Sequence, residues 1–211
     1  MLSTNNQNGP IILVSKDILY TFPFGYAYLA AYLKQHDEKI EVMFRPRKKA
    51  GLKRFVKEIM DKKPFLVGFG TLYPDLYEVK EIIKMLDEER REFPIVIGGQ
   101  MVTPTPEFAL NITGADIGVV GEGEIILHNL VKAIRENKDL KETPGLVIKE
   151  GERIINTGPG EFIKDMSLLP PIPYEMFSEE KWLNIGRFYI NYSQAHWRYN
   201  DKVIAIHGGR G

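Results

Sequence analysis

The chain has 211 residues, with 28 Lys and Arg against 28 Asp and Glu, 44% hydrophobic residues and no cysteine. Such a length suffices for one substantial domain with an appendage. Because the charges balance, no overall electrostatic attraction to nucleic acid or to an acidic membrane is expected. The lack of cysteine excludes disulfides, thiol catalysis and cysteine-held metals within these residues. The polar start "MLSTNNQNGP" and the absence of an apolar run of roughly 20 residues predict a cytoplasmic protein without a membrane segment.

The first 140 residues alternate short apolar runs with amphipathic segments. The apolar runs, which predict β-strands, cover residues 10–15, 39–44, 64–70, 93–99 and 116–121. Hydrophobic residues at the helical spacing i, i+3, i+4, i+7 mark residues 26–33, 52–59, 79–86 and 127–134. Most of the strands are apolar on both faces, as strands between two helix layers must be. The pattern predicts an α/β fold with a doubly wound, Rossmann- or flavodoxin-like five-stranded parallel sheet. We expect the strand order 2-1-3-4-5, with 39–44 near an edge because its polarity partly alternates.

The pattern changes after about residue 140. "GLVIKEGERIINTG" predicts a short hairpin turning at Glu150-Gly151, and the proline-rich "SLLPPIPYEMF" predicts an extended linker on the surface. The aromatic-rich stretch from Trp182 to Tyr199 forms either a cluster covering one side of the domain or a surface for a following domain. We therefore expect three units: a Rossmann-like domain over 1–140, a hairpin and linker over 141–178, and an aromatic segment leading into a last strand over 179–211.

Glycine marks the ends of three consecutive strands: Gly70, Gly98 with Gly99, and Gly121 with Gly123. Ligands of open α/β sheets bind outside the carboxyl ends of the strands. Because glycine has no Cβ, a ligand can approach its backbone closely, and three such ends predict a flat, backbone-lined shelf. The alternative is that each glycine only serves a tight turn between strand and helix.

Two carboxylates, Glu122 and Glu124, fall at the start of the last predicted helix. Acidic side chains there interact favourably with the helix dipole, which is a purely structural explanation. The functional explanation is that they accept hydrogen bonds from a ligand rich in N–H and O–H groups. Either way they disfavour a bound phosphate, and the Walker pattern and the third glycine of the dinucleotide fingerprint are missing. The expected ligand is large and flat, uncharged near Glu122 and edged with amides or hydroxyls.

Taken together, these stretches resemble a known family. "FGYAYLAAYLKQ", "LVGFGTLYPD", "VIGGQMVTPTPE", "DIGVVGEGEIILHNLVKAI", "TPGLVIKEGERI" and "DMSLLPPIPYEMF" occur in the order, and at roughly the spacing, seen in the N-terminal cobalamin (B12)-binding domain of radical S-adenosylmethionine (SAM) enzymes. The resemblance covers residues from about 10 to 211. It implies cobalamin as cofactor, most often as a methyl carrier, and a C-terminal radical SAM barrel as partner domain.

The resemblance also implies which residues contact the cofactor. Thr71 and Leu72 match residues that lie under the corrin ring, and the Gly98-Gly99 pair matches the passage for the nucleotide tail. The full set of cofactor-binding candidates is Thr71, Leu72, Gly98, Gly99, Gln100, Thr103, Gly121, Glu122, Gly123 and Glu124.

The first loop departs from that of methionine synthase, whose Asp-x-His-x-x-Gly supplies a histidine to cobalt. Asp17-x-Leu19 aligns there without a histidine, so we expect base-off cobalamin with no histidine ligand. Met101 stands where many relatives carry histidine. The sequence stops at Arg210-Gly211, where the family's cluster cysteines begin, so a 4Fe–4S cluster and S-adenosylmethionine are expected only if the chain continues past Gly211. The chain thus resembles the cofactor domain of an enzyme rather than the whole enzyme.

Two other functions compete with this one. A flavodoxin-like flavin or nucleotide module would need a Ser-, Thr- and Gly-rich loop after the first strand, and "SKDILYTFPFG" is too aromatic for that. A degenerate domain that has lost cobalamin would fill the shelf above Gly98 and Gly121 with bulky side chains. We assign no metal or catalytic role to the four histidines, and we expect a solvated loop for the basic cluster Arg45, Arg47, Lys48 and Lys49.

Overall fold

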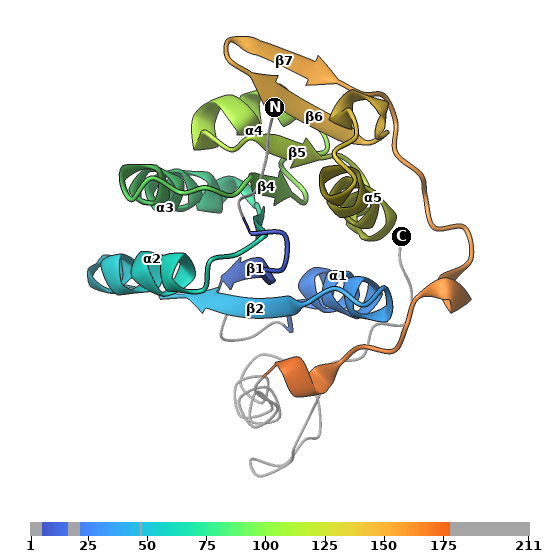
Figure 1. Ribbon diagram of the computed structural model, residues 1–211, viewed down its shortest axis with the longest axis horizontal. Helices are drawn as coiled ribbons and strands as arrows, with labels where there is room; N and C mark the ends of the chain where they lie inside the picture. The colour runs from blue at the N-terminus through green and yellow to red at the C-terminus, as the bar shows by residue number, and fades with distance from the viewer. Residues whose placement is uncertain (1–5, 17–21, 47, 178–211) are drawn as a thin grey trace, which may run out of the picture.

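The computed structural model describes residues 6–16, 22–46 and 48–177 (Figure 1). Within them the strands form one seven-stranded sheet in the order β2-β1-β3-β4-β5-β6-β7. The strands are β1 (Ile11–Lys16), β2 (Ile40–Arg45), β3 (Leu66–Gly70), β4 (Ile95–Gly98), β5 (Ile117–Val119), β6 (Leu146–Glu150) and β7 (Arg153–Asn156). The α-helices are α1 (Phe24–Gln35), α2 (Leu52–Asp61), α3 (Leu76–Glu88), α4 (Pro106–Thr113) and α5 (Gly123–Arg135).

Helices cover both faces of the sheet. One face packs against α2, α3 and α4, and the other against α1 and α5 (Figure 1). Alternate residues of a strand pack into the cores on opposite faces of the sheet. On β1, Ile12 lies in the core on the α2–α4 side and Ile11 in the core on the α1–α5 side. Each helix turns one apolar stripe inward; on α2 it consists of Leu52, Phe55, Val56 and Ile59. Strands between two helix layers have no solvent face, which explains their continuous apolar sequence.

The order of the parallel strands determines where a ligand can enter. β1 pairs in parallel with both β2 and β3, and the pairing continues through β4 to β5. This confirms the predicted order 2-1-3-4-5 and the edge position of residues 39–44. Strand order reverses between β1 and β3, and open α/β sheets bind their ligands near such a switch point, outside the carboxyl ends of the strands.

The predicted hairpin forms as part of the main sheet. β6 pairs antiparallel with β5, and β7 pairs antiparallel with β6. The turn lies at Glu150-Gly151 as predicted, with Gly151 at a φ of 60°. The two extra strands use the hydrogen-bonding edge that β5 would otherwise expose, so the sheet contains seven strands where five parallel ones were predicted.

Helix α4 is the one described α-helix that the apolar spacing did not predict. Its eight residues are too few to show the repeat of an apolar stripe. The signals for it are local, with Pro106 in the first turn and Gly114 in the left-handed conformation directly after the last residue. The sequence of this segment therefore contains a local start and a local stop for the helix, although it shows no apolar repeat.

The segment after β7 runs past α5 and α1 (Figure 1). It contains two short 3-10 turns, Met166–Leu168 and Tyr174–Met176, and its residues are exposed or half-buried apart from Pro173 and Phe177. Its end is not a surface segment, because Phe177 is fully buried and its ring centroid lies 5.1 Å from that of Phe22. The aromatic unit predicted over 179–211 lies outside the described residues.

Candidate functional site at the carboxyl edge of the sheet

The ends of β3 and β4 are tied together by the first of the predicted site residues. Gly70 and Gly98 are register partners. The next residue, Thr71, donates to the Gly98 carbonyl from both its backbone nitrogen, at 2.8 Å, and its hydroxyl, at 3.0 Å. Its side chain is buried, whereas Leu72 follows it with 40% of its surface exposed. Thr71 therefore stabilises the loop internally, and Leu72 is exposed at the carboxyl edge of the sheet.

The loop after β4 is a tight turn that only glycine accommodates well. Gly99 has a φ of 99°, and a Cβ there would lie 3.2 Å from the Thr71 carbonyl oxygen. The Gly99 carbonyl accepts hydrogen bonds from the backbone nitrogens of Val102 and Thr103. The Thr103 hydroxyl in turn accepts from the Gly121 nitrogen at 3.1 Å. Thr103 thus links the β4 loop to the β5 loop, while Gln100 is exposed beside it.

The predicted glycines differ in the space around them. At Gly123 a Cβ would meet Leu29 of α1 at 3.0 Å, so this glycine allows α1 and α5 to pack closely. At Gly121, which has a φ of 98°, no heavy atom of the described residues lies within 4 Å of the Cβ position. At Gly98 the nearest neighbour is Val119, at 3.8 Å. Among the described residues the Cβ position of Gly121 is therefore open and that of Gly98 meets only Val119, at an ordinary contact distance, whereas a degenerate domain was expected to place bulky side chains there.

The two carboxylates occupy different environments at the start of α5. Glu122 directly precedes the helix, and its carboxylate accepts a hydrogen bond from the Ile163 nitrogen at 2.6 Å. Glu124 lies in the first turn and is only 2% exposed. Burial raises the pKa of the nearby Tyr32 phenol, and the negative charges of Glu161 and Glu124 add to the shift. Glu122 therefore holds the linker against the site, and Glu124 belongs to the interior of the α1–α5 layer.

A buried ion-pair network underlies the loop between β3 and α3. Asp75 accepts from Arg45 at 2.7 Å and from Lys16 at 2.6 Å, so it joins the ends of β1 and β2 to the start of α3. Arg45 also pairs with Glu78 at 3.1 Å, and its side chain is 5% exposed. The predicted solvated loop is therefore wrong for Arg45, because the carboxylates on α3 compensate its burial. Lys49 does fit the prediction, with an 82% exposed side chain that pairs with Glu81.

Tyr26 of α1 is a site residue that the sequence did not reveal. Its hydroxyl donates to the Val14 carbonyl at 2.7 Å and accepts from the Gly70 nitrogen at 2.7 Å. Burial of this oxygen raises the pKa of Tyr26 to about 12, so the hydroxyl is protonated and able to donate at neutral pH. The sequence places Tyr26 on the apolar stripe of a helix, and nothing in that spacing marks its hydroxyl as a partner of two strands.

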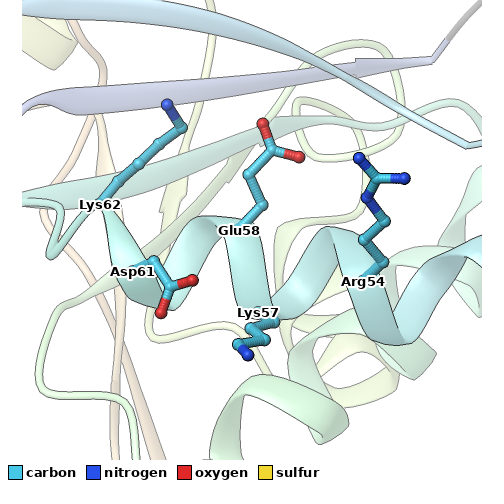
Figure 2. Close-up of a pocket in the computed structure, with 5 residues that line it drawn as sticks. All are labelled: Arg54, Lys57, Glu58, Asp61 and Lys62. Atoms are coloured by element: carbon cyan, nitrogen blue, oxygen red, sulfur yellow. The ribbon is translucent and has the colours of Figure 1, made fainter.

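A separate hollow lies on α2, away from these loops (Figure 2). It is lined by Arg54, Lys57, Glu58, Asp61 and Lys62. These positions form the charged stripe of α2, opposite its buried apolar stripe. With both signs of charge and no apolar lining residue, the hollow is the solvated side of a surface helix.

The histidines that the structure describes lie together. The imidazole centroids of His36, which follows α1, and His128 of α5 are 4.1 Å apart. No group of three or more His, Cys, Asp and Glu side chains that could hold a metal ion occurs in the described ranges. In the same part of the chain, no helix is long and apolar enough to cross a membrane.

An open parallel sheet with helices on both faces and glycine-lined loops at its carboxyl edge defines a ligand-binding domain of the doubly wound class. Comparison with protein families gives a finer assignment. The family model "B12 binding domain" matches residues 11–131, which is more than half of the chain. The chain belongs to the B12 binding domain family.

Relatives and solved structures agree with this assignment. The chain is 28% identical over 163 residues to an uncharacterized methyltransferase of Pyrococcus horikoshii, covering 76% of this chain and 35% of that protein. It is 27% identical over 124 residues to the anaerobic magnesium-protoporphyrin IX monomethyl ester cyclase of Cereibacter sphaeroides, covering 56% and 20%. The chain thus spans about a third or less of the length of these relatives.

Among solved structures, the radical S-adenosylmethionine methyltransferase TsrM of Kitasatospora setae has 25% identity and a TM-score of 0.59, covering 72% of this chain and 30% of that one. The cobalamin-dependent S-adenosylmethionine radical enzyme OxsB has 16% identity and a TM-score of 0.62, covering 74% and 23%, and shares the fold. The resemblance to the cobalamin-binding domain of radical SAM enzymes is confirmed.

Proposed function

We propose that this chain binds cobalamin at the carboxyl edge of its sheet and serves as the cofactor domain of a radical SAM enzyme that transfers a methyl group or carries out a related radical reaction. The observation that carries the proposal is that no described atom lies within 4 Å of the Cβ position of Gly121, and that only Val119 approaches that of Gly98, at 3.8 Å. Cobalamin is a broad apolar macrocycle edged with amides and carrying a nucleotide tail. It suits an edge with exposed glycine backbone and an exposed apolar Leu72.

The residues divide into those that would touch the cofactor and those that shape the loops. Leu72, Gly98, Gly99, Gln100 and Gly121 have half-buried or exposed surface at the edge and would contact it. The loops themselves are held by Thr71, Thr103, Glu122, Gly123 and Glu124. When bound, cobalamin supplies a methyl carrier, while the residues of this chain bind it, orient it and restrict water at its lower face.

We expect the bound cobalamin to be base-off without a histidine ligand. His36 follows the last turn of α1 and so lies near the amino ends of the strands, away from the predicted edge. His128 stacks on it. The sequence from Asp17 to Phe24, between β1 and α1, contains no histidine. A cobalt–imidazole signal in the EPR spectrum of the reduced complex would contradict this expectation.

The first experiment is a titration of the 211-residue protein with hydroxocobalamin, read by visible absorption after desalting. We expect retention near one equivalent with a base-off spectrum. Gly98→Trp should lose most of the bound cobalamin, because the indole would occupy the open space beside β4. Gly98→Ala provides the matched control, since its Cβ would make only an ordinary contact with Val119, at 3.8 Å.

Gly98 is a better position for this test than Gly99, although Gly99→Trp should also abolish binding. The φ of 99° at Gly99 strains any other residue, so loss of cobalamin there would not separate blocking from misfolding. Retention of cobalamin by a folded Gly98→Trp protein, as judged by circular dichroism, would contradict the passage of the nucleotide tail beside Gly98. No retention by the unaltered protein would contradict the proposed function itself.

A partner domain would supply the rest of the enzyme. The relatives are longer than this chain, and the names of the solved neighbours include S-adenosylmethionine and a [4Fe-4S] cluster. We propose a radical SAM barrel, with its cluster cysteines and S-adenosylmethionine site, as the partner domain. We propose that the partner domain defines the substrate.

A further inference from the structure

The linker after β7, residues 157–177, contacts two loops at the carboxyl edge of the sheet. The Ile163 nitrogen donates to the Glu122 carboxylate at 2.6 Å, directly before α5. At the end of the linker, the buried Phe177 ring packs against Phe22, which precedes α1, with the ring centroids 5.1 Å apart. The linker therefore touches the loop after β5 and the loop after β1, and both of these loops lie at the edge where the cofactor is proposed to bind.

The turn that carries Glu122 has little rigidity of its own. Glycine stands on both sides of this residue, at Gly121 and Gly123, and glycine loses more conformational freedom on ordering than any other residue. The Thr103 hydroxyl holds the Gly121 nitrogen at 3.1 Å, and the bond from Ile163 ties the next residue to the linker. The order of this turn therefore depends in part on the linker being in place.

The linker lies directly on α5 where it reaches this turn. A Cβ on Gly160 would collide with the side chain of Ile126, so the linker backbone is packed closely against that helix. Phe162, in contrast, is 63% exposed. The peptide bond that follows Phe162 contains the nitrogen that Glu122 binds. Cleavage after Phe162 therefore requires that the hydrogen bond to Glu122 be open.

We propose that docking of the linker is coupled to the cofactor site, so that cobalamin binding and closure of the Glu122–Ile163 hydrogen bond favour each other. A ligand beside Gly121 would meet an ordered turn when the linker is docked, and would have to order the turn itself when the linker is open. The factor by which the docked linker strengthens binding equals the factor by which the ligand favours docking. This inference rests on the proposed binding of cobalamin, and it means that an occupied site would hold in place the linker that leads to the proposed partner domain.

The test measures chymotrypsin cleavage after Phe162 in the 211-residue protein, with and without saturating hydroxocobalamin, and identifies the fragments by mass spectrometry. We expect the cofactor to slow this cleavage about fivefold. Glu122→Ala removes the hydrogen bond, so it should bind hydroxocobalamin about fivefold more weakly in equilibrium dialysis. In this variant the cofactor should slow the cleavage less than about twofold.

Lys34→Ala is the matched control, because it removes another polar contact of the linker, with Glu175 at 3.2 Å, and leaves the Glu122 turn unaltered. It should keep the fivefold slowing. Equal slowing in the unaltered protein and Glu122→Ala would mean that the cofactor shields Phe162 directly. Loss of the slowing in Lys34→Ala would mean that the linker responds as a whole.

Either of those results overturns the inference and leaves the proposed function standing. Binding of hydroxocobalamin without any slowing of the cleavage does the same. If the unaltered protein binds no hydroxocobalamin, the inference and the proposed function both fail.

Discussion

At the scale of single residues, a buried ion-pair network stabilises the carboxyl edge of the sheet. Asp75 is 3% exposed and balances two cations, Arg45 and Lys16. Arg45 also has a buried Nε without a hydrogen-bond partner in the described structure, so its solvation already depends on its other nitrogens. A buried arginine tolerates this only while a carboxylate stays beside it, because an uncompensated buried charge is costly.

We expect Asp75→Ala to lower the free energy of unfolding by about 3 kcal/mol, since among the described residues Arg45 would keep only the partly exposed Glu78 as an ion-pair partner. Urea denaturation followed by circular dichroism measures it. Replacing Glu88, whose pair with Lys84 is exposed, should cost less than about 0.5 kcal/mol. A loss below about 1 kcal/mol for Asp75→Ala would show that water solvates Arg45.

At the scale of elements, the linker is joined to the ligand-side loops through one carboxylate. Glu122 stands at the start of α5 and accepts from the Ile163 backbone, while Lys34 of α1 pairs with Glu175 further along the same segment. The linker is thus held on the α1–α5 layer at two points. The bond at Glu122 has the charge-assisted character and short length, 2.6 Å, of a stronger hydrogen bond.

Loss of that bond should open the linker locally. Phe162 is 63% exposed and adjoins Ile163, so chymotrypsin can cleave after it when the segment opens. We expect Glu122→Ala to speed this cleavage roughly tenfold in native conditions, with the fragments identified by mass spectrometry. Asp139→Ala is the control, because its carboxylate also accepts a backbone hydrogen bond, from Lys141, in a different turn. Equal cleavage of both variants would contradict a role of Glu122 in holding the linker.

At the scale of the whole molecule, the α1–α5 layer contains a pH-sensitive contact. Burial lowers the pKa of His128, the charge of His36 lowers it further, Glu38 opposes the shift and Lys132 adds to it. The folded protein therefore binds a proton on His128 less readily than the unfolded chain, whose histidine titrates near 6.5. His128 therefore contributes its full stabilisation above the pKa of the unfolded chain. This contribution is lost as the pH falls through the lower pKa that His128 has in the folded protein.

We expect the urea concentration at the unfolding midpoint to decrease when the pH is lowered from 7.5 to 5.5. The decrease should be smaller in His128→Gln, because glutamine cannot take up the proton. The difference between the two proteins across the pH range isolates His128 from the carboxylates, which both proteins share. An identical pH dependence in the two would assign the loss of stability to other groups.

The fold was predictable from the sequence because buried parallel strands and amphipathic helices leave local patterns. The apolar stripe of α2 matches its buried residues, and the partial alternation of residues 39–44 matches an edge strand. α4 was missed because eight residues are too short for a repeat. The site was predictable only as far as glycines mark strand ends, since their surroundings come from other parts of the chain: Leu29 fills the space at Gly123, whereas nothing fills it at Gly121.

By itself, the sequence determined the layers, the strand order and the family to which the chain belongs, because each depends on patterns within about thirty residues or on motifs in order. Only the tertiary structure showed that Arg45 is buried against Asp75, that Glu122 accepts a hydrogen bond from the Ile163 nitrogen and that the Tyr26 hydroxyl bridges β1 and β3. These contacts join residues 30, 41 and 12 positions apart. No spacing rule predicts such contacts, because side-chain partners across elements are selected by packing and by the need to pair buried polar groups.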